Sequence, residues 1–188
     1  MRLESSFDVP VPPERAWDLL QDVPRVIPCM PGAELTETVD DSNWKAKVSV
    51  KLGPIALAFD SDVRREEADE AAGRARLSVK AREVRGRGAA QATVESTLTS
   101  LDGGTRVDVV TDLSLSGAVA QYGRGVVQDV ASQLVASFAE CLRAQLVGSA
   151  EEARVAVEEQ AKPVSGLRLG LRAAARALGR IFHLGRRG

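Results

Sequence analysis

The sequence predicts an α+β fold in which a curved antiparallel sheet of about seven strands grips one long helix. Two observations predict it. Most segments between residues 3 and 116 alternate apolar and polar side chains, as half-buried strands do. Residues 117–147 instead repeat apolar side chains at steps of three or four, which is the period of an amphipathic helix. A long helix after a run of strands is typical of an α+β domain whose helix covers one face of the sheet.

The strands are expected in order along the chain, with two short helical segments after the first. The expected strands are residues 3–9, 33–39, 43–52, 55–63, 73–84, 89–101 and 105–116. Pro13 suits the first turn of a short helix over residues 13–23. The proline-rich residues 26–32 predict a turn or a lid-like loop. Gly53-Pro54 and Asp102-Gly103-Gly104 predict turns between neighbouring strands.

The long helix is expected to begin near Gly117 and to end at Val147, before Gly148. One of its faces is apolar throughout and must contact the sheet. The residues on this face are Val119, Tyr122, Val126, Val130, Leu134, Phe138 and Cys141.

The predicted inner faces of the strands carry several small side chains. These are Ala46, Ser61, Ala75, Ala81, Ala92, Ser96 and Thr111. One interpretation is tight packing where the helix presses on the sheet, because protein interiors are close-packed. The other is an apolar cavity for a hydrophobic ligand. Its expected lining is Ile55, Leu57, Phe59, Val109, Leu115, Tyr122, Val126 and Val130.

Five segments, taken in their order and spacing, resemble one known family. They are VPVPPERAWDLLQD at residues 9–22, PGAE at 31–34, VKLGPI at 50–55, GGTRVDV at 103–109 and AQYGRGVVQDVASQLVASF at 120–138. Together they resemble the G subunit of carbon monoxide dehydrogenase, within the START-like (SRPBCC) helix-grip domains related to polyketide cyclases and lipid-transfer proteins. The resemblance covers about residues 1–147, which are the expected helix-grip domain.

The resemblance implies a non-catalytic partner of a molybdenum-containing dehydrogenase. Such proteins recruit the enzyme to the cytoplasmic membrane and are proposed to hold menaquinone in the helix-grip cavity, so that electrons reach the respiratory chain. Gln121 and Tyr122 could donate hydrogen bonds to the quinone carbonyls, and Leu134 completes the expected ligand site. Tyr122 could instead be a core tyrosine whose hydroxyl reaches the surface. Three alternative functions stay open: a recruitment or assembly factor with no ligand, a START-like lipid carrier, and a START-like enzyme such as a cyclase.

Few residues offer catalytic chemistry. The only histidine, His183, lies in the C-terminal tail, so no Ser-His-Asp or Cys-His arrangement is expected within the domain. No cluster has the spacing of metal ligands, so no metal is expected. Asp60 and Asp62 share a face that is expected to be solvated. Cys29 and Cys141 lack CxxC spacing and are expected to be buried free thiols in a reducing cytoplasm. We therefore expect no enzymatic activity.

The tail differs in charge from the rest of the chain. Residues 162–188 contain seven basic residues and no acid, which leaves 18 basic and 26 acidic residues, a charge of −8, in residues 1–161. After a polar linker over residues 148–166, residues 167–188 form a basic amphipathic pattern. Its expected membrane-binding residues are Leu167, Arg168, Leu171, Arg172, Arg176, Leu178, Arg180, Ile181 and Phe182.

Apolar residues on one side of this segment and arginines on the flank predict an interfacial helix at an anionic membrane surface. A docking helix for a partner protein is the alternative, and the apolar face argues against nucleic acid. With no secretory signal or transmembrane segment in the sequence, the protein is expected to be cytoplasmic and peripheral at the inner face of the cell membrane.

Overall fold

The computed structural model describes residues 1–52 and 55–148, and it contains seven strands and one long helix, as predicted. The strands are β1 (Arg2–Val9), β2 (Ala33–Thr38), β3 (Asn43–Leu52), β4 (Ile55–Asp69), β5 (Arg74–Glu83), β6 (Gly88–Leu101) and β7 (Gly104–Gly117). The helical segments are α1 (Pro13–Gln21), α2 (Val23–Val26), η1 (Ile27–Cys29), η2 (Ala118–Gln121) and α3 (Arg124–Val147), of which η1 and η2 are 3₁₀ turns.

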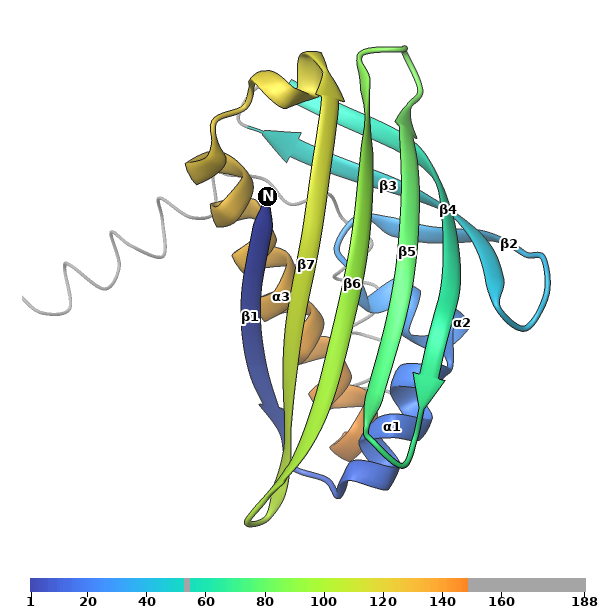
Figure 1. The fold of residues 1–188 in the computed structure, drawn as a ribbon, viewed down its shortest axis with the longest axis vertical. Coiled ribbons are helices and arrows are strands. Elements are labelled where there is room, and N and C mark those ends of the chain that lie inside the picture. The colour runs from blue at the N-terminus through green and yellow to red at the C-terminus, as the bar shows by residue number, and fades with distance from the viewer. Residues whose placement is uncertain (53–54, 149–188) are drawn as a thin grey trace, which may run out of the picture.

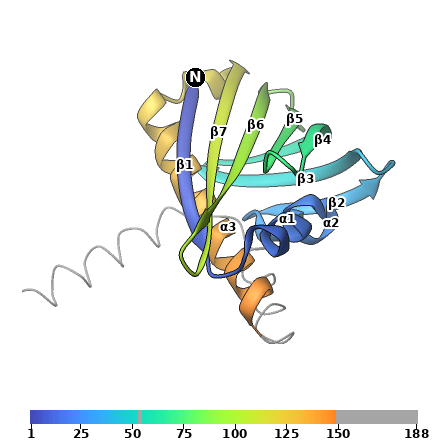
Figure 2. The ribbon, with the colours of Figure 1, turned by 60° about the horizontal axis from the view of Figure 1, so that its bottom comes forward.

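All seven strands form one antiparallel sheet in the order β1-β7-β6-β5-β4-β3-β2. The sheet lies in front of α3 in Figure 1. Turning the molecule shows that β2 and β3 cross at a steep angle to β1 and β7, so that the sheet curves around the helix (Figure 2). The α+β helix-grip fold predicted from the sequence is therefore confirmed.

Apart from shifts of one or two residues at several ends, three segments differ from the predicted ones. β4 continues six residues past Val63 because it stays paired with β5 across a register shift after Arg65. These six residues are mostly charged and do not alternate between apolar and polar side chains, so the sequence pattern did not predict them as strand. The segment at 26–32, predicted as a turn or loop, contains the last residue of α2 and all of η1.

The third difference is the start of the long helix, which begins at Arg124 rather than near Gly117. Gly117 ends β7 with a φ of 72°, and a Cβ built on it would lie 2.7 Å from the Cα of Gly88. The chain therefore turns away from the sheet through η2 before the helix begins. Only a residue without a side chain fits this close approach.

The hydrophobic core lies at one end of the gap between sheet and helix. It joins the C-terminal part of α3 to β1, β7 and the early helices. Its fully buried members include Val107 and Leu142, each 1% exposed, and the rings of Phe7 and Phe138 meet edge to face with centroids 6.2 Å apart. This end of the helix is therefore fixed against the sheet.

The two cysteines belong to this core and are joined to one another. Cys29 of η1 and Cys141 of α3 form a disulfide, with Cα atoms 5.4 Å apart and both side chains fully buried. The prediction of two free thiols was wrong. A separation of 112 residues gives no indication of pairing, but the helical turns at 23–29 bring η1 onto α3. The disulfide therefore ties the segment predicted as a lid to the long helix.

Candidate functional site

The concave face of the sheet faces α3, and the strand register arranges its side chains in rows. One row across the strands is Trp44, Val63, Val79, Ala92 and Leu113. The next row is Ala46, Ser61, Ala81, Ala90 and Leu115. Most of these side chains are apolar and many are small, as the alternation predicted.

The helix covers this face unevenly. Ala139, Cys141 and Leu142 of α3 are fully buried, whereas no residue between 124 and 138 is. Apolar residues of the sheet, such as Val79 and Leu115, also keep part of their surface exposed. Because close packing normally buries such residues completely, the fit between sheet and helix is looser here than in the core. This looser end is the candidate site.

Most of the predicted ligand-binding residues lie around this end. Leu57 is buried on the concave face, and Phe59 and Leu115 are half-buried there. Val109 is half-buried against the core instead. On the helical side Tyr122, Val130 and Leu134 are half-buried. By contrast, Gln121 is exposed and Val126 is 45% exposed, while the neighbouring Val127 is half-buried. The half-buried face of α3 thus begins at Val127 rather than Val126. Ile55 begins β4, and its side chain lies outside the described residues.

Sequence reasoning missed a buried carboxylate at the edge of this face. Glu83 is 4% exposed and accepts hydrogen bonds from the backbone amides of Arg85 and Arg87, at 2.9 and 3.0 Å. The guanidinium of Arg87 lies 3.2 Å from the other carboxylate oxygen and also donates to the carbonyl of Ala56. Glu83 continues the inward alternation of Ala81, which was the available signal.

The environment of Glu83 shifts its acidity in two opposing ways. Burial alone raises the pKa of this carboxyl, because it disfavours the charged form. The amide and guanidinium of Arg87 and the amide of Arg85 outweigh that effect and hold the pKa below its ordinary value near 4.5. Glu83 is therefore an ionised group that closes the turn between β5 and β6, and its hydrogen bonds are already engaged.

A second polar group on the concave face is also engaged. The guanidinium of Arg65 lies 5.3 Å from the ring centroid of Trp44, in cation–π contact. It also donates to the carbonyl and the side-chain oxygen of Gln21 and to the carbonyl of Asp41. Arg65 therefore links α1 to the far strands and has a structural role at the edge of the site.

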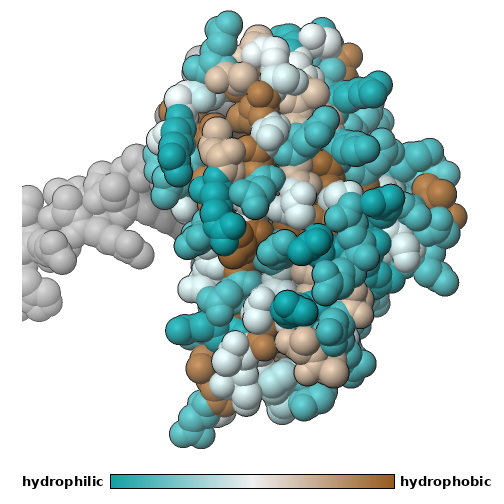
Figure 3. Space-filling view, in the orientation of Figure 1, coloured by the Kyte–Doolittle hydropathy of each residue, from teal (hydrophilic) through white to brown (hydrophobic). Residues whose placement is uncertain are grey.

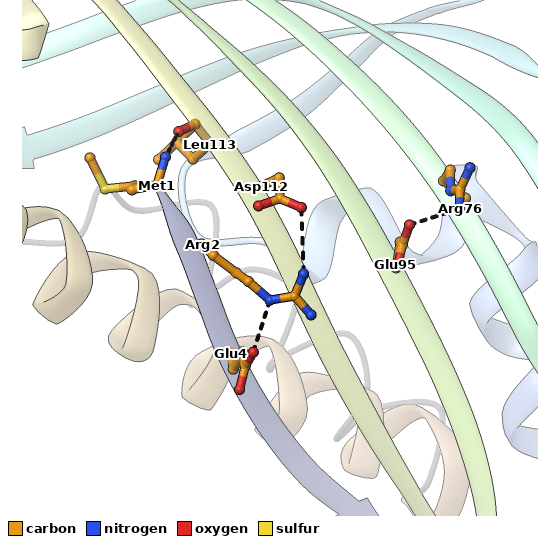
Figure 4. A network of polar contacts seen from close by, with 7 residues as sticks. All are labelled: Met1, Arg2, Glu4, Arg76, Glu95, Asp112 and Leu113. Carbon is orange, nitrogen blue, oxygen red and sulfur yellow. Dashed lines mark hydrogen bonds and ion pairs between the residues drawn. The ribbon is translucent and has the colours of Figure 1, made fainter.

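The convex face of the sheet is largely hydrophilic, with scattered hydrophobic patches (Figure 3). Arg2 contacts Glu4 and Asp112, and Arg76 pairs with Glu95 at 2.8 Å, all with exposed side chains (Figure 4). Such exposed pairs add little stability. Asp60 and Asp62 also lie exposed on this face, opposite basic residues of β3 and β5, so they do not approach the concave site.

Two open grooves are lined by other residues than those of the candidate site. One, of about 540 Å³, runs between β1 and α3 and is lined by Phe7, Val135, Arg106 and Arg143 among others. The other, of about 610 Å³, lies between α1 and the turn from β4 to β5. Within residues 1–52 and 55–148, no group of three or more His, Cys, Asp or Glu residues could hold a metal ion.

The described part of the chain contains no helix that is both long and apolar enough to cross a membrane. The expected linker beyond residue 148 and the expected membrane-binding residues in 167–182 lie outside the described residues. Their assignment stays a prediction.

Comparison with known proteins agrees with this architecture. The family model described as the G subunit of carbon monoxide dehydrogenase (CoxG) matches residues 5–147. No curated protein sequence matches the chain. A conserved protein from Geobacillus kaustophilus is similar in structure, with a TM-score of 0.70 at 20% identity, covering 78% of this chain and 95% of that one.

Two further solved structures share the fold. A START superfamily protein from Mycobacterium smegmatis has a TM-score of 0.53 at 14% identity, covering 77% of this chain and 96% of that one. A protein from Thermus thermophilus has a TM-score of 0.55 at 15% identity, covering 77% of this chain and 99% of that one. At these identities the likeness concerns the fold.

Proposed function

Because the chain belongs to the CoxG family of carbon monoxide dehydrogenase, we propose that it is a non-catalytic accessory protein that binds menaquinone between α3 and the concave face of the sheet. It would serve a molybdenum-containing dehydrogenase of the carbon monoxide dehydrogenase type and link it to the respiratory chain of the membrane. A bound quinone would supply the two-electron chemistry, while the residues of the chain would bind it, orient it and keep water from it.

The observation that carries this proposal is the uneven packing of α3. Apolar side chains on both sides of the gap keep exposed surface at the N-terminal half of the helix, as at Val130 and Leu115, while the other end is closed by the core. Ligand sites are concave and mostly apolar, with few polar groups. An isoprenoid chain needs such an apolar surface, and burying it there stabilises the complex by about 25 cal/mol for each Å² removed from water.

The test is solvent extraction of the purified full-length protein, followed by mass spectrometry for isoprenoid quinones. We expect about one quinone per chain, and loss of that quinone in Val130→Trp, which fills the gap from α3. Gln128→Trp is the matched control because Gln128 is exposed on the same helix, so it should keep the quinone.

A wild-type extract that contains no quinone, and stays so after incubation with menaquinone, would overturn the carrier function. It would favour recruitment of the dehydrogenase without a ligand. Loss of quinone in both tryptophan variants would also contradict the proposed location.

We further propose that residues 167–182 bind the inner face of the cell membrane, and the sequence pattern supports this. Replacing Arg168, Arg172, Arg176 and Arg180 by Gln should reduce flotation with vesicles rich in anionic lipid, because each basic residue contributes about 1 kcal/mol near such a surface. Replacement of the same four by Lys keeps the charge and should preserve flotation. Equal flotation of the Gln and Lys proteins would contradict electrostatic membrane binding.

The link to the dehydrogenase has its own measurement. With carbon monoxide, the dehydrogenase and membranes present, adding this protein should accelerate reduction of the membrane quinone pool, and the Val130→Trp protein should not. An equal rate with and without the wild-type protein would argue against a role in electron delivery.

A further inference from the structure

A row of small side chains crosses four adjacent strands of the concave face. Ala46 of β3, Ser61 of β4, Ala81 of β5 and Ala90 of β6 are direct register partners, each of the next. Larger apolar side chains stand in the neighbouring row, including Trp44, Val63 and Val79. The sheet is therefore lower along the small-residue row than beside it. Ala46 and Ser61 are buried, whereas Ala81 and Ala90 keep part of their surface exposed. The exposed part of this strip is flat and can accept a planar group.

One polar atom in this row has no partner. Ser61 is 5% exposed, and its Oγ makes no hydrogen bond with any other group of the described chain. Its partners across the strands are two alanines, and its neighbours on the same face of β4 are Phe59 and Val63. None of these side chains offers a hydrogen-bond acceptor. A buried hydroxyl without a partner is unfavourable, and such groups in folded proteins require an explanation.

One other buried side-chain polar atom of the described residues also lacks a partner. Among the described residues, the buried side-chain N and O atoms without a partner are the Oγ of Ser61 and the Nε of Arg87. Arg87 lies in the turn after β5, where its guanidinium binds Glu83 and the carbonyl of Ala56. Ser61 is the one of the two that lies on the concave face itself, among the small residues.

We propose that the hydroxyl of Ser61 donates a hydrogen bond to a carbonyl oxygen of a planar quinone ring that lies against the half-buried Ala81 and Ala90. This inference rests on the proposed function and specifies where the polar end of the ligand binds. The ring gains apolar contact from the alanines, and the serine gains the acceptor that its neighbours do not provide. Recognition is then of a flat ring bearing a carbonyl, while the isoprenoid chain extends along the half-buried face of α3.

The test compares two small probes that differ in the carbonyls: menadione (2-methyl-1,4-naphthoquinone) and 2-methylnaphthalene. Binding of each to the full-length protein is measured by titration. We expect Ser61→Ala to lower the affinity for menadione about tenfold, because the loss of a hydrogen bond of about 1.4 kcal/mol corresponds to that factor. The affinity for 2-methylnaphthalene should not fall. Ser114→Ala is the matched control, since Ser114 is exposed on the convex face.

The size of the strip is tested separately. Ala81→Val keeps the serine but puts a larger side chain beside it in the same row. It should therefore lower the affinity for both probes by a similar factor. Circular dichroism confirms that each variant is folded. If Ser61→Ala does not fold, Ser61→Cys, which keeps the size with a weaker donor, should show the same selective loss for menadione to a smaller extent.

The outcomes separate this inference from the proposed function. If the wild-type protein binds neither menadione nor menaquinone, the proposed function fails. If wild type and Ser61→Ala bind menadione equally, or if the variant loses both probes equally, quinone binding stands and the role of Ser61 is overturned. An unchanged affinity of Ala81→Val for both probes would place the ring elsewhere.

Discussion

Removal of the disulfide between Cys29 and Cys141 should strongly destabilise the protein. The bridge joins residues separated by 112 positions, and the chain-entropy model assigns about 4.7 kcal/mol to a loop of about 100 residues. Removal of native disulfides costs roughly 2–5 kcal/mol. Both side chains are fully buried in the core, so replacement by alanine avoids burying a hydroxyl. We expect Cys29→Ala/Cys141→Ala to lower the free energy of unfolding by about 3–5 kcal/mol.

The assay is urea denaturation, followed by circular dichroism, of the wild type and the double variant with and without a phosphine reductant. The reductant should lower the wild-type midpoint towards that of the variant and leave the variant unchanged. A wild-type midpoint that does not respond to the reductant would refute the reasoning. So would two titratable thiols per chain in denaturant without reductant.

Three further predictions concern single side chains. Leu142→Ala should lower the free energy of unfolding by about 2–5 kcal/mol in the same urea assay, because Leu142 is 1% exposed in the core; an equal loss in Val126→Ala, at a 45% exposed position, would contradict this. Ser61→Ala should raise the free energy of unfolding of the ligand-free protein by about 1 kcal/mol, since it removes a buried hydroxyl without a partner; a loss of stability would indicate a partner for that hydroxyl. The lowered pKa of Glu83 means that its ionised form stabilises the fold fully above about pH 4.5 and that this contribution is lost as the pH falls further through the folded-state pKa. Between about pH 6 and pH 3, the melting temperature of the wild type should therefore fall more steeply than that of Glu83→Gln. Parallel curves of melting temperature against pH would contradict this.

The fold was predictable because most strands alternate cleanly along the sequence. Residues 43–52 place Trp44 and Ala46 on one face and lysines on the other, and the structure buries the first set and exposes the second. The alternation fails where tertiary pairing decides the outcome. β4 extends beyond Val63 because β5 continues to pair with it, and no property of the charged sequence there indicates a strand.

The candidate site was only partly predictable. The alternation of apolar and polar residues predicts that Phe59 and Leu115 point inward. The helical repeat predicts which face of α3 contacts the sheet, except that Val127 rather than Val126 is half-buried. That Ser61 has no partner cannot be read from the sequence, because it depends on which side chains the register places beside it. The disulfide was missed for the same reason, since only the folded path of η1 brings the two cysteines together.

The two halves of α3 differ in how tightly they pack against the sheet, and this difference allows the proposed function to be tested separately from stability. Its C-terminal half is fixed by the core around Leu142 and by the disulfide, while its N-terminal half faces the candidate site with no fully buried residue. Stability and the candidate site are thus concentrated at opposite ends of one helix. A substitution such as Val130→Trp should therefore change what the gap admits with a smaller loss of stability than a substitution at Leu142. A Val130→Trp protein that unfolds as readily as Leu142→Ala would show that the two ends are coupled and that the packing around Val130 is as tight as the core.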